Sequence, residues 1–153
     1  MKNTINNEIN DHIKVSNLVH TLTDEIVKSS QLCIDSLKNT GKILLFGNGG
    51  SAADAQHIAA ELVGRYKTER KGLSAIALNT DTSSITSIAN DFGYLNVFSR
   101  QVQALANKGD VLIGISTGGT SANVIKALKL ASDLGCITIG LSGKGGGDFN
   151  SLC

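Results

Sequence analysis

Four short, continuously apolar runs divide most of this 153-residue chain, and helix-like stretches lie between them. The runs are KILLFG (42–47), SAIALN (74–79), DVLIGIS (110–116) and CITIGLS (136–142). A strand that is apolar at consecutive positions is buried on both faces, and parallel strands need helical crossovers. The alternation therefore predicts an α/β fold, a three-layer sandwich in which helices flank a parallel sheet.

The stretches between and before these runs have the apolar spacing of helices. Between the strands, helices are predicted over 52–66, 83–90, 97–107 and 121–135. Before the first strand, Ile5, Ile9 and Ile13 lie four residues apart, which predicts an amphipathic region of one long helix or two short ones. We expect an N-terminal helical region (1–40) followed by an α/β domain (41–153).

Composition excludes several classes of function. The net charge of +1 gives no electrostatic reason to expect a nucleic-acid or membrane surface. No apolar run approaches the length of a membrane span, and MKNTINNEIN lacks the apolar core of a signal peptide. The three cysteines, Cys33, Cys136 and Cys153, form no C-x-x-C pair. A reducing cytoplasm is the expected compartment.

The last ten residues, KGGGDFNSLC, form a glycine-rich loop that leads to no further element. A doubly wound domain normally continues and covers the edge of its sheet. We therefore expect the native protein to be longer than these 153 residues.

Two strand–loop–helix units share one design. Gly49-Gly50-Ser51 follows the first strand, and Gly118-Gly119-Thr120 follows the third. Such loops leave backbone N–H groups at a helix N-terminus, where an anion is favoured, and both loops are expected at the carboxyl edge of the sheet. The alternative is that Ser51 and Ser121 only cap helices.

The anion favoured by these loops is a phosphomonoester. Gly47-x-Gly49-x-x-Ala52 matches a relaxed dinucleotide fingerprint, but no acidic residue follows at the required distance. Neither loop carries the G-K-[ST] of a nucleoside-triphosphate loop.

The helix after the first loop carries His57 and Glu61 at positions i and i+4, with Asp54 one turn earlier. An imidazole and a carboxylate beside a phosphate loop are suited to proton transfer or metal binding. The alternative is an exposed His–Glu pair without a function. Asn90-Asp91 could bind sugar hydroxyls, or could simply form a turn.

Several motifs in order closely resemble the sugar isomerase (SIS) domain family. They are GNGGSAADAQHIAAEL (47–62), IANDFGY (88–94), FSRQV (98–102), SANVIKAL (121–128) and LSGKGGG (141–147). The resemblance implies a flavodoxin-like sheet and a cytoplasmic homotetramer with active sites between subunits. It is strongest to members that convert D-sedoheptulose 7-phosphate to D-glycero-D-manno-heptose 7-phosphate, the first step toward the ADP-heptose of bacterial lipopolysaccharide and surface glycans.

The resemblance also implies a role for each matching residue. Glu61 matches the catalytic base, and His57 with Glu61 matches two ligands of a zinc ion, one per subunit. The family often has serine at Gly118, so one hydroxyl is missing here. The residues implied to bind substrate are Asn48, Gly49, Gly50, Ser51, Glu61, Asn90, Asp91, Ser116, Thr117, Gly118 and Ser121. The remaining zinc ligands and the general acid are expected beyond Cys153.

Two other functions fit the same family. A related non-catalytic scaffold binds the bacterial replication initiator, but it lacks glutamate at the position of Glu61 and has a less glycine-rich first loop. A sugar-phosphate-sensing regulatory domain would accompany a DNA-binding module, and the N-terminal region offers no basic recognition helix. Glu61 and Gly50 favour the enzyme.

Overall fold

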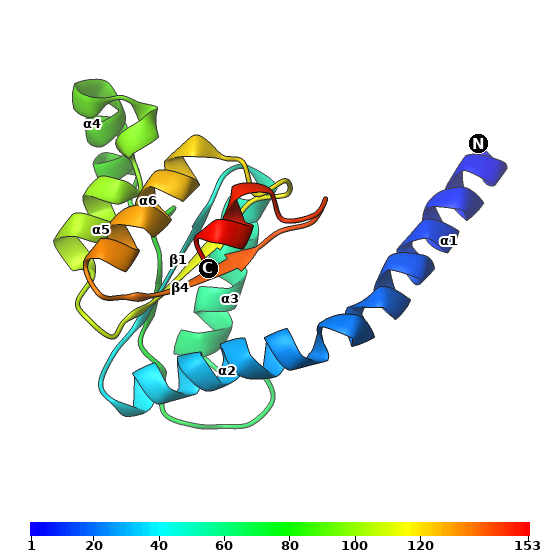
Figure 1. Ribbon diagram of the computed structural model, residues 1–153, viewed down its shortest axis with the longest axis horizontal. Helices are drawn as coiled ribbons and strands as arrows, with labels where there is room; N and C mark the ends of the chain where they lie inside the picture. Colours follow the sequence, from blue (N-terminus) through cyan, green and yellow to red (C-terminus); the bar gives the residue numbers. More distant parts are fainter. The chain divides into compact units, whose positions relative to one another are not determined.

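The computed structural model describes all residues, 1–153, and separates the chain into two compact units, Met1–Leu32 and Cys33–Cys153. The boundary between them lies inside a helix, earlier than the boundary at residue 40 expected from the sequence. The first unit contains α1 (Lys2–Leu18), the 3₁₀ turn η1 (Val19–Leu22) and the start of α2 (Thr23–Lys38). The N-terminal region is thus two helices joined by a turn (Figure 1).

The second unit is built on a four-stranded parallel sheet, as predicted. Its strands are β1 (Ile43–Gly47), β2 (Ala75–Ala77), β3 (Val111–Ile115) and β4 (Ile137–Leu141), in the order β2-β1-β3-β4. β2 pairs with one edge of β1, and β3 pairs with the other edge. The switch between β1 and β3 leaves a crevice at their carboxyl ends, where ligands of open α/β sheets bind.

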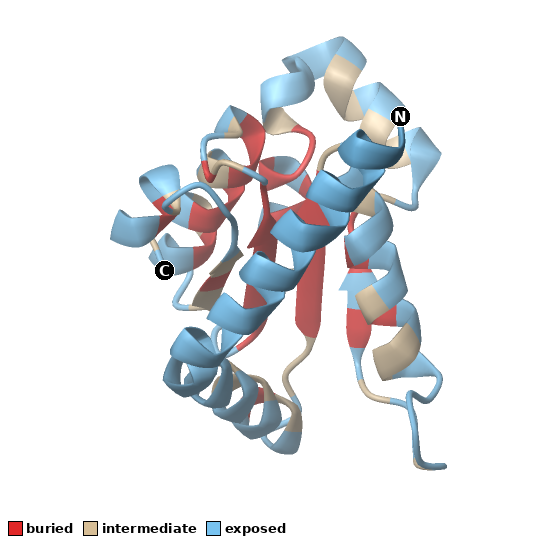
Figure 2. Ribbon diagram, turned by 90° about the vertical axis from the view of Figure 1, so that its right-hand side faces the viewer, coloured by how far each residue is buried: buried red, intermediate tan, exposed pale blue.

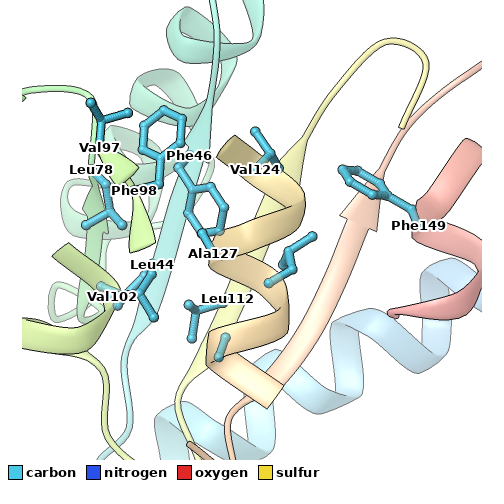
Figure 3. Packing of buried hydrophobic residues seen from close by; sticks show 12 residues of the cluster. Leu44, Phe46, Leu78, Val97, Phe98, Val102, Leu112, Val124, Ala127 and Phe149 are labelled. Carbon is cyan, nitrogen blue, oxygen red and sulfur yellow. The ribbon is translucent and has the colours of Figure 1, made fainter. Parts of the chain in front are cut away.

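Helices cover both faces of this sheet and divide the core into two clusters. The helices of the second unit are α3 (Gly50–Val63), α4 (Thr82–Phe92), α5 (Ser99–Leu105) and α6 (Ala122–Asp133), with 3₁₀ turns η2 (Tyr94–Asn96) and η3 (Gly147–Ser151). On one face Phe46 packs on Phe98, with ring centroids 5.3 Å apart, beside Val124 and Ala127 of α6 (Figure 3). On the other face Leu45 packs with Ala55 and Ala59 of α3.

The burial pattern explains why the strands lack alternation. Residues of β1 and β3 are buried at every position, and the sheet is the buried centre of the unit in Figure 2. Consecutive residues of a strand therefore pack into the core clusters on opposite faces, as expected for a parallel sheet with helices on both faces.

At the amino ends of the strands a buried carboxylate joins β1 to β3. Asp110, 2% exposed, accepts hydrogen bonds from the backbone N–H and the Nζ of Lys42, at 2.9 and 2.6 Å, and from Asn107 N at 2.7 Å. Burial raises the pKa of Asp110, but the bonds from Lys42 and Asn107 outweigh it and hold the pKa below its ordinary value.

Two predicted segments differ from the structure. The helix expected over 52–66 ends at Val63, since Gly64 follows and the Arg70 guanidinium binds the last carbonyls. The C-terminal glycine-rich segment is predicted to be a loop that leads to no further element, yet it forms η3 and buries Phe149 to 3% exposure. Phe149 packs where any side chain at Gly140 of β4 would stand, so the missing side chain makes room for the ring. None of the helices is both long and apolar enough to cross a membrane.

Candidate functional site

Two helix N-termini lie beside each other at the carboxyl edge of the sheet. α3 begins after Gly49, which has a φ of +58°, and α6 begins after Ser121. Neither N-cap residue makes a side-chain capping bond: Ser51 lies within α3, and the Ser121 hydroxyl lies 2.9 Å from that of Ser116. Neither serine therefore caps a helix with its side chain, although Ser121 occupies the N-cap position of α6. The N–H groups of Ser51 and Ala52 in α3 and of Val124 in α6 already donate to neighbouring oxygens. What both N-termini offer an anion is therefore the positive end of the helix dipole and the N–H groups that precede these.

A groove of about 420 Å³ follows this edge of the sheet. Three segments line it: the first half of α3, the end of β3 with the loop after it, and the end of β4. Its lining residues are Ser51, Asp54, His57, Ile58, Ile115, Ser116, Thr117, Leu141, Ser142 and Gly143. Hydroxyl donors thus meet at the two helix N-termini, while the apolar residues form the wall of the groove. This combination is suited to a polar, anionic ligand.

His57 and Glu61 lie on one face of α3, as their spacing predicts. The distance from His57 Nε2 to Glu61 Oε1 is 3.3 Å, and the side chains are 78% and 38% exposed. A second hollow of about 290 Å³ adjoins the groove through His57 and Ile58, and Glu61, Tyr66 and Arg70 also line it. The Glu61 carboxylate is thus accessible beside the anion groove.

His57 and Glu61 are residue types that bind zinc, but the two do not complete a metal site. An imidazole nitrogen and a carboxylate oxygen are both zinc ligands, and they lie close enough to share one ion. No group of three or more His, Cys, Asp or Glu side chains in the chain is placed to hold a metal. His57 and Glu61 therefore supply two of the roughly three protein ligands of a catalytic zinc.

The structure brings only part of the predicted substrate site together. Ser51, Ser116 and Thr117 line the groove, and Ser121 joins them through Ser116. Asn90 and Asp91 lie at the end of α4, bond to each other at 2.8 Å and do not line the groove.

Asn48 lies at the end of β1, and its amide bonds to Asn123 and Tyr94. Gly118 contributes only main chain beside Thr117. Gly49 and Gly50 begin α3, and a Cβ at either would meet open space, so a ligand can approach both.

The glycine-rich segment after β4, residues 143–148, is hydrogen-bonded to the 116–121 loop. The Thr117 carbonyl accepts a hydrogen bond from Gly143 N at 3.0 Å, and the Gly119 carbonyl accepts one from Asp148 N at 3.1 Å. Gly119 has a φ of +65°, and a Cβ there would overlap the Gly146 carbonyl oxygen. The two loops are therefore joined backbone to backbone, with no side chain between them.

Residue-level reasoning from the sequence missed several members of the site. Ser142 and Gly143 follow an apolar strand in the way that Ser116 and Thr117 do, and this parallel could have identified them. Asn123 and Arg70 gave no such signal, because their partners lie in segments that meet only in the folded chain.

Comparison with known proteins finds relatives that are similar in sequence and in fold. The SIS domain model matches residues 8–143. A phosphoheptose isomerase of Aliarcobacter butzleri is 60% identical over 154 residues, covering 100% of this chain and 82% of the relative. One of Helicobacter hepaticus is 58% identical over 153 residues, covering 100% of this chain and 78% of the relative. The solved phosphoheptose isomerase of Neisseria gonorrhoeae superposes with a TM-score of 0.92 at 44% identity, covering 99% of this chain and 79% of that one.

Proposed function

The chain belongs to the SIS domain family and is similar in sequence and fold to its phosphoheptose isomerases. On that premise we propose that it converts D-sedoheptulose 7-phosphate to D-glycero-D-manno-heptose 7-phosphate, at the start of the route to the ADP-heptose of lipopolysaccharide and surface glycans. One observation carries the proposal: an accessible carboxylate, Glu61, lies on the same helix whose N-terminus opens into a hydroxyl-lined anion groove.

The groove would hold the phosphate. The Ser51, Ser116 and Thr117 hydroxyls and the N-termini of α3 and α6 supply neutral donors and partial positive charge. No Lys or Arg lines the groove, so binding depends on hydrogen bonds and helix dipoles. Such a site favours a phosphomonoester on a polyhydroxylated chain over a bulky nucleotide.

Glu61 would move the proton. Converting the ketose to the aldose takes a proton from C1 to give an enediolate and returns a proton to C2. The Glu61 carboxylate would accept the C1 proton, and a separate acid group would exchange protons with the two oxygens. His57 Nε2 lies 3.3 Å from this carboxylate on the same face of α3.

We propose in addition that one zinc ion per subunit is held partly by His57 and Glu61. The support is the chemistry and closeness of the two donors, and the remaining ligands come from outside this pair. When bound there, zinc would stabilise negative charge on a substrate oxygen.

The assembly we propose is a homotetramer in the cytoplasm. Ile5, Ile9 and Ile13 form an apolar stripe on α1 and are 53%, 52% and 50% exposed, which suits contact with other copies of the chain. Cys33, Cys136 and Cys153 are free thiols, as a reducing compartment favours.

Turnover in deuterated water tests the function. The complete gene product, supplied with zinc, is incubated with sedoheptulose 7-phosphate, and the product is followed by NMR beside Glu61→Gln. We expect an aldoheptose phosphate with deuterium at C2 and a loss of kcat of at least 10²-fold in the variant, because the amide cannot accept the proton. A tetramer without turnover would reject the isomerase and favour the non-catalytic scaffold that binds the replication initiator.

A further inference from the structure

Two asparagine amides form a reciprocal pair between the first loop and α6. Asn48 Nδ2 donates to Asn123 Oδ1 at 2.8 Å, and Asn123 Nδ2 donates to Asn48 Oδ1 at 3.0 Å. Asn123 is 6% exposed, so it is shielded from ligand, whereas Asn48 is only half-buried. The pair joins residues 75 positions apart in the sequence.

The direction of every bond in this pair is set by one backbone group. Val124 N–H can only donate, and it donates to Asn123 Oδ1 at 3.0 Å. The Asn123 oxygen must therefore face the start of α6, and its NH₂ group must face Asn48. The Asn123 NH₂ group needs an acceptor, so the Asn48 oxygen must face it. The backbone of α6 therefore determines the orientation of both side-chain amides.

This arrangement uses all but one of the bonding positions of Asn48. Its Oδ1 accepts from Asn123 Nδ2 and, at 3.2 Å, from the Tyr94 hydroxyl, which occupies both lone pairs. Its Nδ2 uses one hydrogen on Asn123. What remains is a single N–H, so Asn48 can act on a ligand only as a donor.

We propose that Asn123 is a positioning residue that fixes Asn48 as an N–H donor to an oxygen of the sugar phosphate. This inference rests on the proposed function. Asn123 does not touch the substrate. Its bond from Val124 N–H at the start of α6 fixes its own orientation, and its bonds to Asn48 then fix the orientation of the Asn48 amide. Tyr94, in η2, completes the acceptor side of Asn48.

Asn123→Asp tests the proposal with little risk to the fold. The carboxylate still accepts the Val124 N–H and is favoured at a helix N-terminus, but it has no hydrogen to give to Asn48 Oδ1. A carboxylate oxygen then faces Asn48 Oδ1 in place of the Asn123 NH₂ group, so the reciprocal pair can no longer form and Asn48 must move. We expect kcat/KM to fall about tenfold, with KM changing more than kcat because a binding contact is lost.

A double-mutant cycle separates positioning from general damage. If Asn123 acts through Asn48, adding Asn123→Asp to Asn48→Ala lowers kcat/KM no further than Asn48→Ala alone. The matched control is Asn39→Asp, the same change at an exposed position just before β1, and we expect it to leave kcat/KM within twofold. Full activity of Asn123→Asp, or multiplicative losses in the double variant, would overturn the proposal.

A measurement independent of turnover distinguishes this proposal from the isomerase assignment. Side-chain ¹⁵N–¹H spectra report how fast the Asn48 amide protons exchange with water. Slow exchange of one proton in the wild type that is lost in Asn123→Ala, which removes the acceptor, supports the pair even if sedoheptulose 7-phosphate is not turned over. Equal exchange in the two proteins rejects the pair, whatever the activity.

Discussion

Polar side chains at the two ends of the strands have opposite roles. At the amino ends, Asp110 is saturated with hydrogen bonds and buried. At the carboxyl ends, the Ser51 and Thr117 hydroxyls face a groove. Substitutions at the first end should therefore change stability, and substitutions at the second should change ligand binding.

Asp110→Asn should lower the free energy of unfolding by about 2 kcal/mol, because Lys42 Nζ loses its charged partner in a mostly buried setting. Urea denaturation of both proteins measures this difference. The control is Asp11→Asn, which removes an exposed pair with Lys14 and should change stability by less than about 0.5 kcal/mol. Equal effects of the two substitutions would contradict the role of Asp110.

The same carboxylate gives stability a defined pH dependence. Since the folded-state pKa of Asp110 is lowered, its contribution is complete above the unfolded pKa of about 3.9 and is lost as the pH falls through the folded value. The wild type should thus lose more stability than Asp110→Asn between pH 5 and the acid range of about pH 3.

At the scale of elements, the end of α3 depends on one side chain from the following loop. Arg70 donates to the carbonyls of Glu61, Leu62, Gly64 and Lys71. The guanidinium thereby caps carbonyls that the helix leaves unpaired and places positive charge at the negative end of its dipole. The last turn of α3, which carries Glu61, is held by this cap.

Arg70→Lys should therefore lower both stability and activity. An ammonium cannot reach carbonyls on two sides as the planar guanidinium does, so we expect a loss of about 1–2 kcal/mol. kcat should fall severalfold as the Glu61 backbone loosens. Thermal unfolding and steady-state kinetics give the two readings. Lys71→Ala, at the exposed neighbouring position, should change neither, and an Arg70→Lys protein indistinguishable from it would exclude the cap.

Elements that depend on local pattern were predictable from the sequence, and those that depend on distant contacts were not. All four strands were predicted to within two residues at each end, because an apolar run with glycine or polar residues at its ends is a local signal. The end of α3 was predicted three residues too late, because nothing local shows that Arg70 folds back. The amide pair of Asn48 and Asn123 depends on the register of β1 against β3, which no motif encodes.

At the scale of the whole molecule, the exposed isoleucines of α1 predict self-association. Replacing Ile9 and Ile13 together by Glu should convert the proposed tetramer to smaller species, because charges would have to be buried between copies. Light scattering after size exclusion measures the mass, and circular dichroism should show unchanged helix content. Asn7→Glu, two residues from Ile9 and so on the other side of the helix, should leave the mass unchanged. A double variant with the wild-type mass would reject this surface as the interface.

The contact between the 116–121 loop and the segment 143–148 also determines when the binding site becomes ordered. Fixing a residue's backbone takes roughly 1–2 kcal/mol of conformational entropy. Because Gly143 and Asp148 hold the carbonyls of Thr117 and Gly119, that loss occurs when the chain folds and not when a ligand arrives. The loop is preorganised, so the free energy of each new hydrogen bond to phosphate goes into affinity instead of into ordering the protein.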